Sequence, residues 1–495
     1  MVKDLIHSWG NRGGRFLVIA VVLVCGMSGC VTDPVTGSKK FSLLSRDQEI
    51  ALGQQGDSQI VAQYGVYDDP AVASYVEGLG KSLAAKSEDP NYPYTFRVLN
   101  TPVVNAFALP GGWVYITRGL MAYLQDEAQL AVVMGHEIGH VNAHHTARQY
   151  STQQLTSLGL GLASIFFEKA RPFLGAAQTG LQLLFLANSR DDEREADELG
   201  VRYATKLGYQ AGEASKFFET LQRIEDQSQG GALPTWQSTH PDPGERVVNV
   251  QTLTAKYQQQ YPSAQYTGTD PEQYLPHLNN MVFGENPRQG FVQGGVFYQP
   301  DLQIQFPVPS GWQVANFATQ VQMAPAAGDA AIIMTAGGNT DPTSAANQFI
   351  QGNNAQVTSG GPTTIGGFPA YQIQSNLNVD DGNGGTTVLT ALSAFINKNG
   401  ILYVFHGYTT QAQFGTYAST FQSVEGGFAQ VTNQSVLSVQ PSRLQVFHAP
   451  RTDQFQALVQ PSAQLNFSVN DLAIMNERQL TDQVAAGTSL KQVQP

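Results

Sequence analysis

Cysteine and positive charge are scarce in this chain of 495 residues. It has two cysteines, and its 27 lysines and arginines are outnumbered by 39 acidic residues, which gives a net charge of -12. Two cysteines allow at most one disulfide bond. A chain this acidic has no basic face of the kind that binds nucleic acid, so we expect no nucleic-acid partner.

The apolar runs are also short. Residues 16–27, 155–167 and 173–186 are each below the ~20 residues that a membrane-spanning helix needs. The first run follows several basic residues and is typical of the core of a signal peptide. We expect the other two to be helices of the core or of a cleft wall. The alternative is a hairpin that dips into lipid or grips an apolar substrate.

The segment Met27-Ser28-Gly29-Cys30 resembles a bacterial lipobox. We therefore expect residues 1–29 to be a signal peptide and Cys30 to carry lipid, which leaves the mature chain without a second cysteine and without a disulfide. Val31 stands where Asp commonly retains lipoproteins in the inner membrane, so we expect a periplasmic protein anchored in the outer membrane of a Gram-negative bacterium. An uncleaved membrane anchor is the alternative.

The most specific motif is His136-Glu137-Ile138-Gly139-His140, inside a helix whose N-cap and capping box are predicted at Asp126 and Gln129. Histidines four apart project from one side of a helix, about 6 Å apart along its axis, so both can reach one metal ion. The alternative is a pair of core histidines bonded to carbonyls. We favour the metal, because burying two imidazoles and a carboxylate without one is costly.

A His-His-Glu zinc site needs a third protein ligand and one open position. His144 lies about 12 Å along the helix axis from His136, too far to share the ion. The candidate is Glu193, in a second helix predicted to begin at Ser189. Asp197 lies one turn further on the same face, where it could accept the free N–H of a ligating histidine. The alternative for both carboxylates is a solvated acidic helix start.

Four motifs resemble the gluzincin metallopeptidases of the CAAX-prenyl-protease and HtpX type, in particular their soluble periplasmic BepA-type lipoprotein branch. They are the helix of residues 136–140, the segment of residues 189–197, Asn105-Ala106-Phe107-Ala108-Leu109-Pro110-Gly111-Gly112 and Ser238-Thr239-His240-Pro241. The resemblance covers residues 40–255. It implies a zinc endopeptidase with one Zn2+ per chain, held by His136, His140 and Glu193, and with Glu137 as the catalytic base.

The alternation of residues 105–117 predicts a strand. The resemblance implies that this strand is an edge of the cleft. There Asn105, Ala106, Phe107 and Ala108 would pair with an extended substrate through main-chain hydrogen bonds. The alternative is an ordinary core strand.

His240, in a proline-rich loop, has three possible roles. It could cap a turn, stabilise the transition state or occupy the open zinc position as a latch. The resemblance favours a place near the active site, and our hypothesis is that His240 gates the metal. We expect Arg246 to hold this loop through a carboxylate.

The predicted fold class is α+β, in several parts. These are a mainly helical zincin-type metallopeptidase domain with a small edge-strand sheet (residues 30–255), a linker (256–291), a small α+β accessory domain (292–433) and a C-terminal module (434–495). In the accessory domain we expect helices near residues 344–350 and 417–421, and a hairpin over residues 389–405 that turns at Asn399-Gly400.

Residues 434–495 resemble a LysM module, a βααβ unit, which implies contact with peptidoglycan. A plain docking domain is the alternative.

Two classes of function remain open. The first is a zinc metalloendopeptidase that removes misfolded or stalled envelope proteins, such as outer-membrane β-barrel precursors. The second is a non-enzymatic periplasmic chaperone or assembly factor with a structural or regulatory zinc. The intact glutamate of the motif favours the enzyme, because a structural site has no use for a base beside an open coordination position.

Overall fold

The computed structural model describes residues 30–32, 37–157, 188–228, 240, 243–338, 341–380, 386–462 and 465–494. The predicted signal peptide and nearly all of the two apolar runs between residues 155 and 186 lie outside these ranges. Among the described helices, none combines the length and the apolar character that crossing a bilayer requires.

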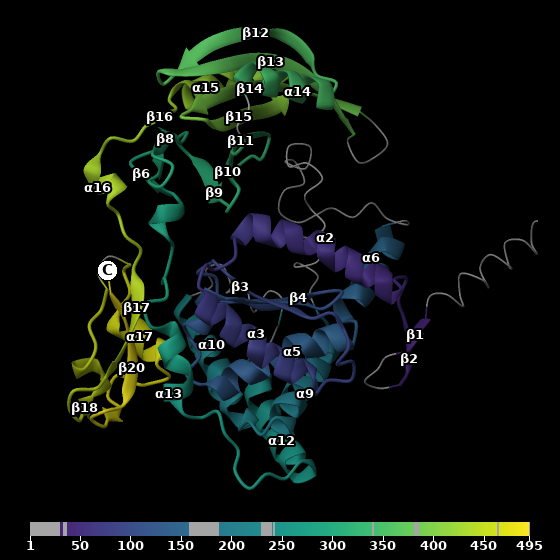
Figure 1. Cartoon of the computed structure of the whole chain (residues 1–495), viewed down its shortest axis with the longest axis vertical. Helices are drawn as coiled ribbons and strands as arrows, with labels where there is room; N and C mark the ends of the chain where they lie inside the picture. Colours follow the sequence, from purple (N-terminus) through teal and green to yellow (C-terminus); the bar gives the residue numbers. More distant parts are fainter. Residues whose placement is uncertain are drawn as a thin grey trace, which may run out of the picture.

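Figure 1 shows three parts of the molecule. The helical domain (residues 37–283) contains a small sheet, the accessory domain (287–430) lies above it in this view, and the C-terminal lobe (443–494) lies at its side. This mixture of helices and sheets confirms the predicted α+β class.

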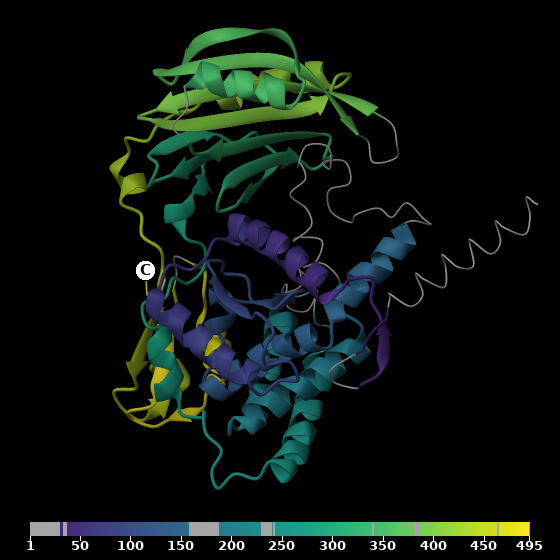
Figure 2. The same ribbon diagram turned by 45° about the vertical axis from the view of Figure 1, so that its right-hand side comes forward.

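The helical domain packs its helices on both faces of a three-stranded sheet. The helices are α2 (Arg46–Tyr64), α3 (Pro70–Ala84), α4 (Arg118–Met121), α5 (Glu127–Asn142), α6 (His145–Ser157), α9 (Arg190–Lys206), α10 (Ala214–Ser228) and α12 (Pro243–Gln260). The strands β3 (Thr95–Leu99), β4 (Ala106–Leu109) and β5 (Trp113–Thr117) have the order β3-β5-β4. Figures 1 and 2 show α2 on one side of this sheet and α3 and α5 on the other.

The prediction of one strand over residues 105–117 is wrong in one respect, because the structure divides it into β4 and β5. The two strands pair antiparallel. Between them lie Pro110, which has no backbone N–H to offer a sheet, and Gly111 and Gly112, whose φ angles are +86° and +97°. This turn leaves β4 at the edge of the sheet, next to α5.

The two helices that carry the motifs begin close to where the sequence predicts. Asp126 caps α5 by accepting a hydrogen bond from Gln129 N (2.9 Å). The Gln129 side chain accepts instead from Gln125 N, so the predicted capping box does not close there. Ser189 and Asp192 form a complete capping box at the start of α9. After Ala128 every residue of α5 is buried, which fixes the helix in the core.

The accessory domain holds two antiparallel sheets. One has the order β16-β8-β7-β6 and the other β12-β13-β14-β15-β11-β10-β9. The strands are β6 (Phe291–Gln293), β7 (Val296–Gln299), β8 (Ile304–Pro307), β9 (Trp312–Asn316), β10 (Gln320–Pro325), β11 (Ala330–Ala336), β12 (Gln356–Ile365), β13 (Phe368–Asp380), β14 (Thr386–Lys398), β15 (Ile401–Thr410) and β16 (Ala429–Gln430).

The local predictions for this domain are confirmed. The two helices are α14 (Pro342–Gly352) and α15 (Phe414–Gly426), and the hairpin of β14 and β15 turns at Asn399 and Gly400, both with positive φ. The domain meets the helical domain at α2, where Ala318 N donates to Gln63 O (3.0 Å).

The C-terminal lobe shares one hydrophobic core with the helical domain. Its elements are β17 (Arg443–His448), β18 (Asp453–Gln454), η4 (Phe455–Ala457), α17 (Val469–Met475), β19 (Gln483–Val484) and β20 (Ser489–Gln494). Leu472 and Met475 of α17 are fully buried in the same cluster as Leu130 and Val133 of α5. The LysM-like order of the lobe is not confirmed as a separate module, because its core residues are buried against its neighbour.

Polar contacts fix the lobe to the start of α5. The fully buried Lys491 donates from Nζ to the carbonyls of Ala122 and Leu124, both at 2.7 Å. Gln129 of α5 donates to Glu477 (2.9 Å). The two bonds from Lys491 satisfy carbonyl groups between α4 and α5 that the helices themselves leave open.

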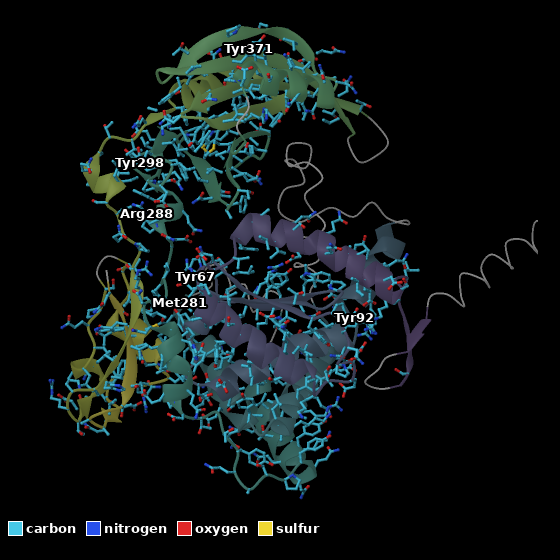
Figure 3. The ribbon with its side chains drawn as sticks, in the orientation of Figure 1. Tyr67, Tyr92, Met281, Arg288, Tyr298 and Tyr371 are labelled. Atoms are coloured by element: carbon cyan, nitrogen blue, oxygen red, sulfur yellow. The ribbon has the colours of Figure 1, made fainter. Side chains whose placement is uncertain are left out.

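The segment predicted to be a linker (256–291) also packs against this core. It contains α13 (Pro271–Tyr274) and η2 (Leu275–Leu278), and Tyr274 is fully buried. Leu444 N of β17 donates to Met281 O (2.8 Å), and Val282 N donates to Tyr67 OH (3.3 Å). Tyr67 and Met281, labelled in Figure 3, mark this junction. Residues 271–283 therefore belong to the core of the helical domain, and the accessory domain begins after them.

We predict that Leu472→Ala destabilises the helical domain together with the lobe. Removing a fully buried leucine side chain costs about 2–5 kcal/mol, and the cavity here lies in a shared core. Hydrogen exchange should become faster at the amides of α5 as well as in the lobe. Val292→Ala, at a side chain that is 45% exposed, is the control. Faster exchange in the lobe alone would contradict a shared core.

Candidate metal centre

Four buried side chains from three segments form one cluster. His136 and His140 come from α5, Glu193 from α9, and His240 from the loop before α12, and each offers a ligand atom within 4.8 Å of the others. The Nε2 atoms of the two α5 histidines are 2.9 Å apart. Glu193 Oε1 lies 3.4 Å from His140 Nε2. The structure thus brings together the three predicted ligands and adds His240 as a fourth neighbour.

Small residues bring α5 and α9 close enough for this cluster to form. A Cβ on Gly200 of α9 would lie 2.7 Å from the backbone nitrogen of His136, and one on Gly139 would lie 3.2 Å from Ala196 O. A side chain at Gly200 would therefore push the helices apart. The close approach of the two backbones is what places Glu193 opposite the two histidines.

Charged side chains orient His136 from behind. Asp197 Oδ1 lies 2.9 Å from its Nδ1, and Arg246 donates to both oxygens of Asp197. A carboxylate held by a guanidinium accepts the Nδ1 proton, so the Nε2 lone pair of His136 points into the cluster. Asp197 therefore lies behind a ligating histidine, where the sequence analysis expects it. Arg246 does bind a carboxylate, that of Asp197, but it does so from α12.

His140 has a matching partner that the sequence reasoning did not single out. His145 Nδ1 lies 2.8 Å from His140 Nδ1, and the other ring nitrogen of His145 lies 3.2 Å from Glu195. The sequence did contain a hint of this partner, because His145 follows the motif helix closely as the second residue of the pair His144-His145. His144 itself turns away, with a φ of +56°, to Glu49 Oε2 (2.8 Å).

The protonation states suit metal ligands. Burial lowers the pKa of His136 and of His140 well below the usual value, which keeps both imidazoles neutral. Burial alone would raise the pKa of Glu193, but His240, His140 and Arg246 lower it to about 2. The cluster therefore offers two neutral nitrogens and an ionised carboxylate.

Glu137 lies beside the cluster with unused hydrogen-bonding capacity. It is 1% exposed, and neither of its carboxylate oxygens has a hydrogen-bond partner among the described residues. Oε1 lies 3.6 Å from His240 Nε2. Burial raises the pKa of Glu137 to about 7. A group in this state can both accept and release a proton near neutral pH.

His240 lies inside the site rather than at its rim. Its Nδ1 is 3.0 Å from both oxygens of Glu193 and 3.3 Å from His136 Nε2. The ring is 2% exposed. This position argues against a role of His240 as a turn cap alone. Stabilising the transition state and occupying the open zinc position both stay predictions.

The predicted substrate-binding residues lie on or just before the edge strand. Ala106, Phe107 and Ala108 belong to β4, and Asn105 precedes it. Asn105 is 2% exposed, and its side-chain oxygen has no hydrogen-bond partner in the described part of the chain. β4 pairs with β5 on one side only, and it runs beside α5.

The residues fit a zinc ion. Zinc prefers nitrogen and oxygen ligands in a tetrahedral arrangement, and two histidines with one carboxylate are a common set. Two imidazole nitrogens 2.9 Å apart, with the Glu193 carboxylate 3.4 Å from one of them, lie close enough to bind one ion together. The unpartnered Glu137 carboxylate beside them is also consistent with a water held at the metal.

Comparison with known proteins finds similarity to metallopeptidases. Residues 70–254 match the model of peptidase family M48. The beta-barrel assembly-enhancing protease of Yersinia pestis is 33% identical over 44% of this chain and 46% of that protein. The protein of that name from Escherichia coli K12 is 31% identical over 44% and 46%. The mitochondrial metalloendopeptidase OMA1 of Danio rerio is 29% identical over 51% and 57%.

The chain spans about half the length of the curated relatives that it matches. The matched region nevertheless contains α5, α9, the loop of His240 and most of α12, so all the residues of the metal centre lie within it. Residues 70–254, which hold the metal centre, thus match a peptidase M48 domain.

Proposed function

We propose that this protein is a zinc metalloendopeptidase of the bacterial cell envelope that cleaves misfolded or stalled envelope proteins. The observation that carries the proposal is the buried cluster of His136, His140 and Glu193 with an unpartnered glutamate, Glu137, beside it. A structural zinc site has no use for such a base. The relatives named as proteases support the same reaction.

The residues of the site have separate tasks in this reaction. Zinc bound by the three ligands would polarise the scissile carbonyl and make a water molecule more acidic. Glu137 would take a proton from the attacking water on a carboxylate oxygen and pass it to the leaving amine. Asp197 and Arg246 would keep His136 in the tautomer whose Nε2 faces the metal.

The edge strand β4 would hold the substrate. Among the described strands β4 pairs on one edge only, and it packs against α5, so an extended chain could pair with Asn105, Ala106, Phe107 and Ala108 through main-chain hydrogen bonds. Such pairing is independent of sequence and requires an unfolded or extended segment. This requirement favours misfolded proteins as substrates.

The envelope is the proposed location because of the amino-terminal sequence. The lipobox-like segment ending at Cys30 supports a lipid anchor, and Val31 supports sorting to the outer membrane. Relatives named for β-barrel assembly support outer-membrane β-barrel precursors among the substrates. For the C-terminal lobe we favour a docking role, because its core residues pack against the peptidase domain. Peptidoglycan as a partner stays a prediction.

We predict that Glu137→Gln abolishes proteolysis and leaves zinc bound. Loss of a general base lowers the rate by about 10²–10⁴-fold. Digestion of casein and of a denatured outer-membrane β-barrel protein, followed by gel electrophoresis, measures the effect. Glu77→Gln on α3, in an exposed ion pair with Lys81, is the matched control. Equal digestion by parent and Glu137→Gln would support the non-enzymatic chaperone instead.

We predict that His240→Ala increases proteolysis and keeps the zinc. In this proposal His240, 3.3 Å from His136 Nε2, takes the open position that a catalytic zinc needs, and its removal would free that position. We expect the initial rate of proteolysis to rise about tenfold, because one interaction that competes with the substrate is lost. Initial rates on casein, with zinc content measured on the same sample, test this. The control is His448→Ala in the lobe, whose side chain is 64% exposed. Unchanged or lower proteolysis would contradict an inhibitory latch.

A further inference from the structure

His145 is a fully buried histidine that the proposed reaction does not use. It is the first residue of α6 and lies directly behind His140, with the Nδ1 atoms of the two rings 2.8 Å apart. Its other ring nitrogen, Nε2, lies 3.2 Å from Glu195 and 3.4 Å from Asp192, both on α9. His145 therefore connects a candidate metal ligand to two carboxylates.

The turn between α5 and α6 places this ring. α5 ends at Asn142, and His144 has a left-handed φ of +56° before α6 begins. A residue other than glycine rarely adopts this conformation without support from its neighbours. Here Nδ1 of His144 lies 2.8 Å from Glu49 Oε2. Arg148 of α6 pairs with Asp192 of α9 (2.6 Å), so α6 is also held on the side where the carboxylates lie.

The position of the hydrogen on His140 decides whether this residue can bind a metal. A neutral imidazole carries one hydrogen, on Nδ1 or on Nε2, and the other nitrogen is the one that can act as a ligand. Nε2 of His140 faces the cluster, 2.9 Å from His136 Nε2 and 3.4 Å from Glu193 Oε1. Binding of zinc through this atom therefore requires the hydrogen to be on Nδ1, where it needs an acceptor.

His145 can be this acceptor if its own hydrogen is on Nε2. Glu195 and Asp192 favour that arrangement, because an ionised carboxylate only accepts hydrogen bonds. The reverse order, in which Nδ1 of His145 donates, would put the hydrogen of His140 on the nitrogen that faces the other ligands. Since the His145 ring is fully buried, both of its contacts are shielded from solvent, which strengthens them.

We propose that His145 is a positioning residue, which accepts the Nδ1 hydrogen of His140 and thereby keeps the Nε2 lone pair of His140 directed at the metal. The two carboxylates of α9 hold His145 in the tautomer that can accept. The arrangement parallels the support of His136 by Asp197, with an imidazole inserted between the ligand and the carboxylate. This inference rests on the proposed role of His140 as a zinc ligand, and it concerns the affinity for zinc rather than the chemical step.

The zinc affinity of two variants distinguishes this role from simple packing. His145→Asn keeps an acceptor, because its amide oxygen stands at the same place along the side chain as Nδ1, whereas His145→Leu fills the space without one. Competition with a chelator of known zinc affinity measures the dissociation constant. We expect His145→Leu to bind zinc about 10–100-fold more weakly than the parent, and His145→Asn to recover most of this loss. A packing role predicts the opposite order, because leucine is the better replacement in a buried site.

The control is His448→Leu, the same substitution at a side chain that is 64% exposed in the C-terminal lobe, and it should bind zinc as the parent does. Circular dichroism of each variant verifies that it folds. Equal zinc affinity of the parent and a folded His145→Leu protein would overturn the proposal. Weaker binding by His145→Asn than by His145→Leu would overturn it too.

Nitrogen-15 NMR of the zinc-free parent tests the hydrogen positions themselves and does not depend on how the variants fold. The chemical shifts of histidine nitrogens differ between protonated and bare atoms, and signals are assigned by their loss in His140→Gln and His145→Asn. We expect the hydrogen of His140 on Nδ1 and that of His145 on Nε2, and a hydrogen on Nε2 of His140 would overturn the proposal. A parent that binds no zinc would contradict the proposed function, whereas the NMR result would still decide this inference.

Discussion

The metal centre depends on the close contact between α5 and α9. Gly139 and Gly200 allow the two backbones to approach until Glu193 faces the histidine pair. The other features of the site follow from this contact. Asp197, one turn after Glu193, reaches the back of His136, and Arg246 holds Asp197 from α12. A larger residue at Gly200 would meet the backbone of α5 and force the two helices apart, which would move Glu193 away from the histidine pair.

Those parts of the site that lie within single helices could be predicted from the sequence. Helical spacing puts His136 and His140 on one face, and the serine cap sets the start of α9 and thereby the face of Glu193. The hairpin at Asn399 and Gly400 follows from turn chemistry in the same way. Each of these predictions needs only residues that are neighbours along the chain.

The rest depends on contacts between distant segments. The sequence gives no local sign that Lys491 would reach the carbonyls before α5, or that Glu49 would meet His144. For the same reason the C-terminal lobe resembles an independent module in its sequence, while its core is shared with the peptidase domain. The division of residues 105–117 into two strands could have been predicted from neighbouring residues, because Pro110-Gly111-Gly112 is a strong turn signal.

The zinc content of the purified protein tests the account most directly. After dialysis against metal-free buffer, elemental analysis should find about one zinc per chain. Glu193→Ala should lose most of it, whereas Asp191→Ala, at a side chain that is 93% exposed on the same helix, should keep it. A parent protein without zinc, or full zinc occupancy in Glu193→Ala, would contradict a metal held by His136, His140 and Glu193.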